Sequence, residues 1–469
     1  MIDTILTILA TSIYLPAVAG FVRDIRNTPT SPVQTAQHRN RQFLLGCLSL
    51  ELVSTLAFPS VMYIAGVLTV FALLVYCIVQ RPKLRFNSLL VVSLLYIIWF
   101  AVSLLWSGNK GNGAMVLFTQ CLPIVLAALI SSAISISRDE ISKLLRTFCY
   151  SAYIFAALIA VSWAASSYEL HLSPSDWSIM QKTYICGLSQ YQWLFRFLGG
   201  HITGYLHPSY NLLPMFFAVI AASWLCKGGR AIQHLLWIFL WLCAFAATLL
   251  TQSRMGILYS VIILLTNCLY LPSNTRRRFA YTAVATSAIL ISGAFTHDFW
   301  QQYGSDTARE TMNDYAVRYI KTKPLTGAGA GNMNPLEICR TIGETYWPNY
   351  GQLPTEGEIR QWPVHTNMRP HNQWLADWVH AGVAAALLTL MLYICVIARC
   401  YEDKNYWGMA FILIFTIFSL LEPPLYIGKG LYLFCSVSCL IFASSRPGEN
   451  RTKEQGHKNK DIRTSVQRI

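Results

Sequence analysis

The chain has 469 residues, of which 54% are hydrophobic and only 12% are charged. Soluble globular domains carry about 25% charged residues, so this composition excludes an ordinary soluble protein and indicates a membrane protein with many spans. The formal net charge of +14 is attributed to membrane topology and to contact with anionic membrane lipids, and we expect no nucleic-acid partner.

Apolar stretches long enough to cross a membrane core of roughly 30 Å recur along the whole chain. They predict an all-α polytopic protein with 12 or 13 transmembrane helices. The stretch at 43–58 is short, contains Glu51 and stops at Pro59, so half of a tight hairpin is the alternative there. The first stretch lacks the basic region and cleavage site of a signal peptide, so we count it as a span. The expected spans are 3–22, 43–58, 60–80, 88–106, 114–137, 147–165, 209–226, 231–252, 255–270, 279–296, 374–398, 407–421 and 430–445.

Lys and Arg gather between alternate spans, and this bias predicts the orientation. If the basic tail at 446–469 is cytoplasmic, the inside segments hold 24 of the 36 basic residues, although the outside loops are much longer. The chain then divides into four segments. The first, 1–296, holds spans and an outside loop at 166–208. A large outside loop at 297–373, further spans over 374–445 and a disordered, basic tail at 446–469 follow. The inside segments are 23–42, 81–87, 138–146, 227–230, 272–278, 399–406 and 446–469.

Thirteen cysteines are present, and most lie within apolar stretches. This placement indicates small buried side chains and not a disulfide framework. Cys186 and Cys339 alone lie in the large outside loops, where a bond between them is an open alternative.

The outside loop at 297–373 is rich in aromatic residues and nearly balanced in charge, which argues against a disordered linker. Apolar residues at helical spacing predict a short amphipathic helix over 313–323, lying at the membrane surface and folded back over the bundle. Pro324 ends this helix, and GAGAGN follows at 327–332. No strand precedes the glycines, so a flexible turn is favoured over a phosphate loop.

The expected spans at 209–226, 255–270 and 374–398 are among those that begin on the outer side, so their N-termini, with free N–H groups and positive dipole ends, point outward. Arginines and helix N-termini at one level of a membrane form an anion site, because both suit phosphate oxygens. The polar residues at these ends are Arg196, His201 and His207 before 209–226, Ser253 and Arg254 before 255–270, and Arg369, His371, Asn372, Asp377 and His380 around the start of 374–398.

These residues carry a family resemblance. HNQWLADWVHAG, from His371 to Gly382, resembles the pattern of His, then Asn, Ser or Gln, then nine residues and Gly in the large periplasmic loop of O-antigen ligases and their polymerase relatives. TQSRMG around Arg254 resembles the Ser-Arg element of that family, and the stretch from Arg318 through KPLTGAGAGN resembles its Arg, helix, Pro-Leu-x-Gly-x-Gly element. Ala385 departs from the pattern, because ligases usually have a second Gly there; Ala is also small enough for close helix packing.

The resemblance implies a GT-C-like glycosyltransferase of the bacterial inner membrane that acts in lipopolysaccharide biosynthesis. Its partners would be an undecaprenyl-diphosphate-linked glycan donor, lipid A-core as acceptor and membrane lipids, with no cofactor. Displacing a diphosphate at an anomeric carbon needs donors for the leaving group and a base for the acceptor hydroxyl. No Asp-x-Asp pair occurs in the chain, so we expect no metal, and a single displacement with inversion at the anomeric carbon.

We assign the diphosphate to Arg254 and Arg318, helped by Arg196, and the base to His371, because a helix N-terminus and nearby arginines favour the neutral imidazole. The residues assigned supporting roles are Asn372, Asp377, His380 and His207.

Each assignment has a structural alternative. Arg254 could snorkel to lipid headgroups, and Arg318 could belong to a solvated helix face. His371 could merely cap the helix beside Asn372, the better N-cap. His380 could be a buried structural histidine, and Asp377 could orient a histidine or pair with an arginine. His201 and His207 could be interface or substrate-lining groups.

Three enzyme classes share this chemistry: an O-antigen ligase, which we favour, an O-antigen polymerase, and a protein O-oligosaccharyltransferase. A transporter or flippase would be expected to show paired charges or Gly and Pro breaks at mid-membrane in both halves. The polar groups here gather at one face instead, which favours an enzyme.

Overall fold

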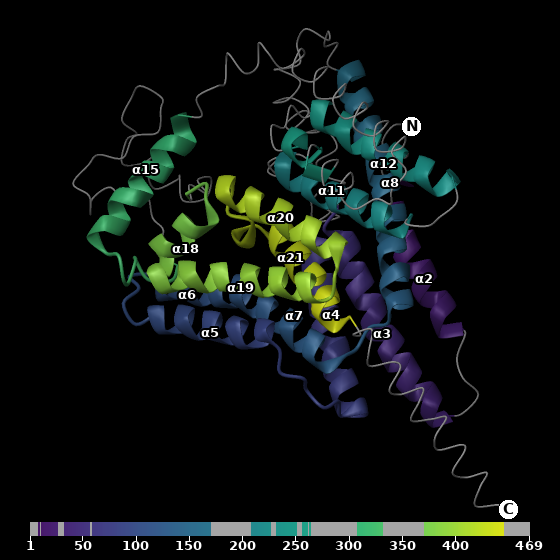
Figure 1. Cartoon of the computed structure of the whole chain (residues 1–469), viewed down its shortest axis with the longest axis horizontal. Helices are drawn as coiled ribbons and strands as arrows, with labels where there is room; N and C mark the ends of the chain where they lie inside the picture. Colours follow the sequence, from purple (N-terminus) through teal and green to yellow (C-terminus); the bar gives the residue numbers. More distant parts are fainter. Residues whose placement is uncertain are drawn as a thin grey trace, which may run out of the picture.

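The computed structural model describes residues 8–9, 11–26, 32–56, 59–169, 208–226, 231–250, 256–260, 262–263, 307–331 and 370–444. This part of the chain is helical (Figure 1), and its extended pairing is an isolated parallel bridge between Ile136 and Ser444. The expected all-α class is therefore confirmed for the described residues.

The helices of the described residues follow in chain order. Their bounds are α2 Leu15–Arg26, α3 Pro32–Ser54, α4 Pro59–Gln80, α5 Ser88–Ser103, α6 Lys110–Val116, the π-helical turn η1 Leu117–Cys121, α7 Leu122–Ala133, α8 Arg138–Glu169, α11 Pro208–Leu225, α12 Ala231–Leu250, α15 Thr307–Thr322, α18 Gln373–Ala381, α19 Val383–Glu402, α20 Tyr406–Leu421, the 3-10 turn η5 Pro424–Tyr426 and α21 Gly428–Ala443.

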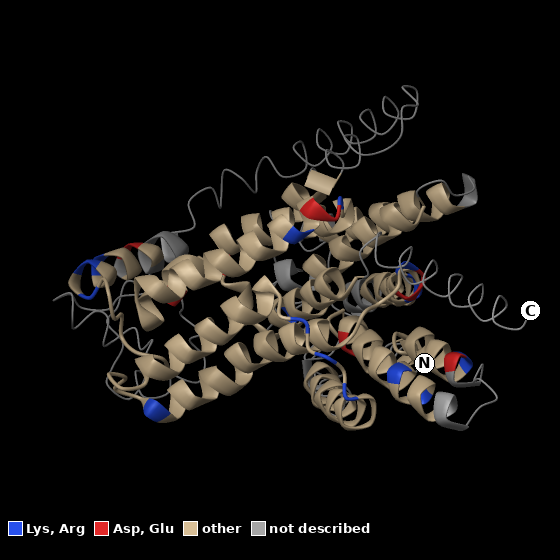
Figure 2. Cartoon of the chain, turned by 60° about the horizontal axis from the view of Figure 1, so that its bottom comes forward, with Lys and Arg blue, Asp and Glu red and all other residues tan. Residues whose placement is uncertain are grey.

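Several of these helices have the character of membrane spans. Within the described residues, four are long and apolar enough to cross a membrane: Val61–Gln80, Lys110–Ala133, Arg138–Val161 and Val383–Glu402. Five more apolar helices are shorter: Ser88–Ser103, Leu212–Leu225, Gln233–Thr248, Tyr406–Leu421 and Gly428–Ala443. Most of the helical surface carries no charge (Figure 2). A membrane protein is thus confirmed, while the total of 12 or 13 spans and the GT-C-like architecture stay predictions.

The stretch at 43–58 forms one arm of a helix pair, as the hairpin alternative predicted. α3 ends at Ser54, and α4 begins at Pro59 and packs along it. Glu51 is buried within this pair, and its Oε1 accepts a hydrogen bond from Ser436 Oγ of α21 at 3.1 Å. A polar partner inside the bundle explains how an acidic residue can lie in an apolar stretch.

α21 lies inside the bundle, against α3, α7, α11 and α19 (Figure 1). Nearly every residue from Lys429 to Ala443 is buried, as expected of a helix that is apolar on all sides. Its Phe434 packs against Phe415 of α20, with ring centroids 5.2 Å apart, and against Tyr393 of α19 at 5.5 Å. These aromatic contacts hold α19, α20 and α21 together, and so fix the positions of the helix ends near the polar residues of the expected site.

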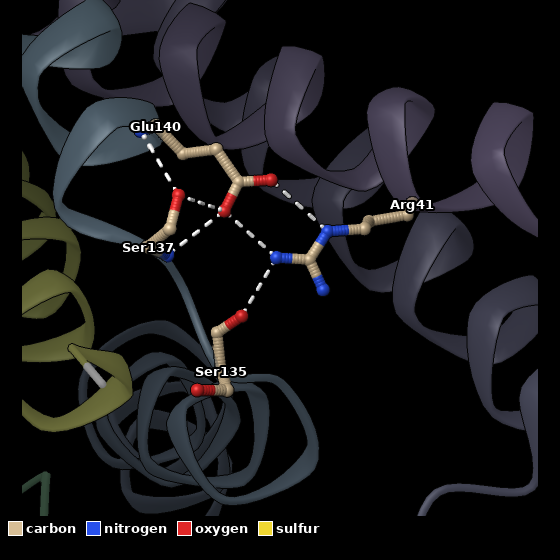
Figure 3. A network of polar contacts seen from close by, with 4 residues as sticks. All are labelled: Arg41, Ser135, Ser137 and Glu140. Carbon is tan, nitrogen blue, oxygen red and sulfur yellow. Dashed lines mark hydrogen bonds and ion pairs between the residues drawn. The ribbon is translucent and has the colours of Figure 1, made fainter. Parts of the chain in front are cut away.

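Segments expected on the inside meet at one end of the bundle. Arg41 of α3 donates two hydrogen bonds to the carboxylate of Glu140 in α8, at 2.8 and 3.1 Å, and one to Ser135 O at 2.7 Å (Figure 3). At the same end, Arg399 donates to Ser444 O at 3.3 Å. This gathering agrees with the charge bias along the sequence, and the membrane side that this end faces stays a prediction.

We expect the Arg41→Gln variant to lose about 1–2 kcal/mol of stability. Hydrogen bonds to charged groups contribute about 1.5–3 kcal/mol, and partial exposure reduces this. The side chains of Arg41 and Glu140 are 30% and 20% exposed. Denaturant unfolding of Arg41→Gln, Glu140→Gln and the double variant should give a coupling free energy of the same size.

Lys143→Gln is the matched control, because Lys143 is 55% exposed and lies 3.6 Å from its partner Asp24. It should change stability by no more than about 0.5 kcal/mol. An equal loss of stability in Arg41→Gln and Lys143→Gln would mean that the ion pair of Arg41 with Glu140 contributes no more than an exposed ion pair does.

Candidate functional site

The start of α18 is set by Asn372. Its backbone is extended, with φ −160° and ψ 128°, and its side chain accepts a hydrogen bond from Leu375 N at 3.1 Å. Its Nδ2 donates to Leu420 O at 3.1 Å, which ties α18 to the end of α20. The expected N-cap is thereby observed, and His371 lies one residue outside the helix. Because Asn372 caps α18, the imidazole of His371 does not cap the helix and can bind another partner.

That partner is Glu422, the residue that follows α20. His371 Nδ1 lies 3.1 Å from Glu422 Oε2. The Glu422 side chain is 3% exposed, whereas the His371 side chain is 30% exposed. An ionised carboxylate only accepts hydrogen bonds, so Nδ1 is the donor in this contact, and a ring with a single proton would present Nε2 as its acceptor. The pair thus has the arrangement of a base and the carboxylate that orients it.

The sequence-based interpretation of the outer rim does not include Glu422, although the sequence contains a signal for it. The residue is acidic and lies between the apolar stretch at 407–421 and the pair Pro423 and Pro424. An acidic residue at the end of a span is costly near a bilayer unless it serves a site. Its pairing with a residue 51 positions earlier depends on how α18 packs on α20, which local patterns do not reveal.

Asp377, one of the expected supporting residues, is fully buried within four hydrogen bonds. Its Oδ2 accepts from Thr389 at 2.6 Å and from Gln373 at 2.9 Å. Its Oδ1 accepts from Tyr426 at 2.7 Å and from Tyr96 at 3.4 Å. These donors compensate the burial of a carboxylate. No arginine contacts Asp377 among the described residues.

His380 is joined to Asp377 through one hydroxyl. His380 Nδ1 lies 2.8 Å from Tyr426 OH, and its ring packs edge-on against Phe100 with centroids 6.2 Å apart. The Tyr426 hydroxyl has one proton, which an ionised Asp377 accepts, so His380 Nδ1 donates to the hydroxyl oxygen. His380 is 2% exposed and fits the structural alternative better than the role of a proton partner at the surface.

The same network fixes the loop that carries Glu422. Gln373 Oε1 accepts from Leu425 N at 2.9 Å, and Tyr426 is held by Asp377. Both anchors lie in η5, three and four residues after Glu422, and their partners lie on α18, two and six residues after His371. The buried network therefore holds the two members of the His371 and Glu422 pair against each other.

The span expected over 374–398 is broken, which corrects the sequence-based prediction of one continuous helix. α18 ends at Ala381 and α19 begins at Val383. Gly382 between them has φ 78° and ψ −177°, a region that only glycine adopts without strain. A Cβ at Gly382 would lie 1.9 Å from Leu325 O. The chain needs glycine here because the backbone of the preceding loop passes directly over the break.

The glycine-rich segment is packed and not the flexible turn that we expected. Gly327, Gly329 and Gly331 all have positive φ, and the segment from Gly327 to Ala330 is buried. Ala328 N donates to Val379 O of α18 at 2.7 Å, and Ser107 Oγ donates to Ala330 O at 2.7 Å. Without side chains, the glycines allow backbone to lie on backbone, so the segment braces α18 against the end of α5.

The amphipathic helix expected over 313–323 is present as α15, which ends at Thr322. Ala316, Tyr319 and Ile320 are buried against Val379 of α18, so the helix does fold back onto the bundle. Arg318 lies on the other face, 44% exposed, and forms an ion pair with Asp314. A diphosphate-binding role for Arg318 stays a prediction.

Several expected residues lie outside the described residues. They are Arg196, His201, His207, Arg254, Arg369, Cys186 and Cys339, together with the span at 279–296, the tail at 446–469 and most of the loops at 166–208 and 297–373.

The fold and the site together define an all-α membrane protein with a histidine and carboxylate pair at the entry to a broken helix. Residues 238–390 match the family model described as O-antigen ligase. The matched segment runs from within α12 to within α19 and contains α15, the glycine-rich segment, His371 and Gly382. The resemblance seen in the sequence is thus confirmed for this segment. The search of curated proteins finds no match.

Proposed function

We propose that the protein is an O-antigen ligase, which transfers a glycan from undecaprenyl diphosphate to lipid A-core at the periplasmic face of the inner membrane. The observation that carries this proposal is the pair of His371 and Glu422 at the start of α18, inside a segment that matches the O-antigen ligase family. A transferase without a protein nucleophile needs a base for the acceptor hydroxyl, and the pair supplies one.

In the proposed step, the acceptor hydroxyl oxygen forms a bond to the anomeric carbon while the bond from that carbon to the diphosphate oxygen breaks. The hydroxyl proton moves to His371 Nε2, and undecaprenyl diphosphate leaves with the bonding electrons. Glu422, across the ring at Nδ1, stabilises the imidazolium that forms. A single displacement of this kind inverts the anomeric centre.

Arg254, Arg318 and Arg196 are proposed to bind the diphosphate, so that the charge of the leaving group is met by side chains and no metal is required. Guanidinium groups suit this role because they offer two parallel donors to phosphate oxygens. Arg318 supports the proposal in one respect, since its side chain is 44% exposed on α15 and is not buried in the bundle.

Arg254 provides a test that depends on geometry as well as charge. Arg254→Ala should lower transfer by about 10²-fold or more, and Arg254→Lys should recover only part of it, because an ammonium keeps the charge but loses the bidentate contact. Lys110→Ala is the control, as Lys110 begins α6 on the same expected side and is exposed. Equal activity of the wild type and both Arg254 variants would identify a snorkelling residue.

A polymerase is the second candidate, and Ala385 favours it. Ligases usually have glycine at this position, whereas Ala385 here is fully buried and its N donates to Gly382 O at 3.1 Å. A protein O-oligosaccharyltransferase shares the donor chemistry as well, and the three enzymes differ in the molecule that supplies the hydroxyl.

The acceptor therefore decides among them. Purified protein with a lipid-linked donor and excess EDTA would be offered lipid A-core, free lipid-linked glycan or a peptide in separate reactions. We expect product with lipid A-core. Product only with the second acceptor would identify a polymerase, and product only with the peptide a protein transferase. Loss of activity in EDTA that added divalent metal restores would contradict the metal-independent step.

A further inference from the structure

A polar cavity lies at the end of α19 opposite to His371. It has a volume of about 460 Å³ and lies among α5, α7, α19 and α21. This volume falls in the range of roughly 300–1,000 Å³ that is usual for small-molecule sites. The glycan-transfer site does not use it, because its lining residues belong to the other ends of these helices. They include Arg85, Asn87, Ser131, Arg399, Glu402 and Ser444.

The lining carries charges of both signs. Arg85 comes from the connection before α5, and Arg399 and Glu402 come from the last turn of α19. Arg399 is held in place by Asp403 at 2.9 Å and by Ser444 O at 3.3 Å, and its side chain is 12% exposed. Guanidinium groups suit a phosphate, and a carboxylate suits an ammonium group. A ligand with both groups would match this lining better than a simple anion.

The rim of the cavity is apolar and exposed. Phe86, beside Arg85, is 80% exposed and lines the cavity. On α19, Ile394 and Ile397 are 51% and 37% exposed, next to the lining residues Cys395 and Ala398. Aromatic and apolar side chains beside basic ones are typical of the level of lipid headgroups in a membrane. The position therefore favours an occupant that has both a polar headgroup and acyl chains.

We propose that this cavity binds the headgroup of a zwitterionic phospholipid, with the phosphate against Arg85 and Arg399 and a primary ammonium against Glu402. The acyl chains would lie along the exposed side of α19. Phosphatidylethanolamine has this headgroup chemistry. Phosphatidylglycerol offers no cation to Glu402, and phosphatidylcholine has a quaternary ammonium that donates no hydrogen bond.

Native mass spectrometry of the purified full chain tests the proposal, with one of the three phospholipids added at a time and with matched acyl chains. We expect phosphatidylethanolamine to be retained about fivefold better than the other two, the factor that one partly exposed ion pair provides. Equal or stronger retention of phosphatidylglycerol would overturn the proposal. Soluble glycerophosphoethanolamine should compete weakly, and competition as strong as that of the lipid would assign the cavity to a soluble phosphodiester instead.

Four variants separate the two halves of the headgroup. Arg85→Gln should reduce the retention of all three lipids, since each has a phosphate, and Arg85→Lys should keep most of it. Glu402→Gln should remove only the preference for phosphatidylethanolamine. Lys83→Gln, an exposed cation in the same connection that does not line the cavity, should bind as the wild type does. A preference that survives in Glu402→Gln would contradict the assigned ammonium contact.

Discussion

The His371→Ala variant should lose glycan transfer by about 10²- to 10⁴-fold while its level and its insertion into the membrane stay normal. A general base contributes about 10²- to 10⁴-fold, and this side chain is partly exposed and does not cap α18. Glu422→Gln should lower kcat by about 10- to 10³-fold with little change in KM, because an amide does not stabilise the imidazolium. Initial rates with purified protein and a lipid-linked donor would measure both.

The double variant distinguishes a catalytic pair from two independent structural residues. If Glu422 acts only through His371, adding Glu422→Gln to His371→Ala should cause no further loss. His380→Ala, a substitution within α18 nine residues after His371, is the comparison, and we expect a smaller effect because His380 is buried against Tyr426. Multiplied losses in the double variant would separate Glu422 from the mechanism, and full activity of His371→Ala would remove His371 from it.

The features that the sequence predicted well are those with local causes. The helix at 313–323, now α15, follows from apolar residues at helical spacing, and the N-cap at Asn372 follows from its side-chain chemistry next to an apolar stretch. The gathering of Arg41, Arg399 and their neighbours at one end follows from the charge bias between spans. The first two signals are each contained within a few turns of helix, and the third is a sum of Lys and Arg over the segments between spans.

The features that the sequence did not predict depend on contacts between distant segments. Glu422 pairs with His371 because α18 packs on α20, and no periodicity reports that contact. The glycine-rich segment looked flexible by composition, yet its positive φ values and missing side chains let it pack against Val379 and Ser107. The chain is also largely apolar on both sides of Gly382, so hydropathy alone predicts one helix where the backbone breaks.

Gly382→Ala should destabilise the protein by more than about 3 kcal/mol and abolish transfer. The φ of 78° with an extended ψ costs a non-glycine residue about 1–3 kcal/mol, and the added Cβ would meet Leu325 O at 1.9 Å, which forces the loop away from α18. Displacing that loop also loosens α18, which carries His371. Thermal and denaturant unfolding of the purified protein, with transfer assayed in parallel, would measure both effects.

The sign of the stability change separates the broken helix from a continuous one. In a continuous span at 374–398, replacing glycine by alanine should stabilise the protein by about 1 kcal/mol, because alanine is the better helix former. Ala385→Gly is the control on α19 and should cost only about 1 kcal/mol for the same reason, plus a small loss of packing at a buried site. A Gly382→Ala variant that melts at or above the wild-type temperature would therefore rule out the break in the helix. It would also rule out the close packing of residues 325–331 against α18, which holds His371 opposite Glu422.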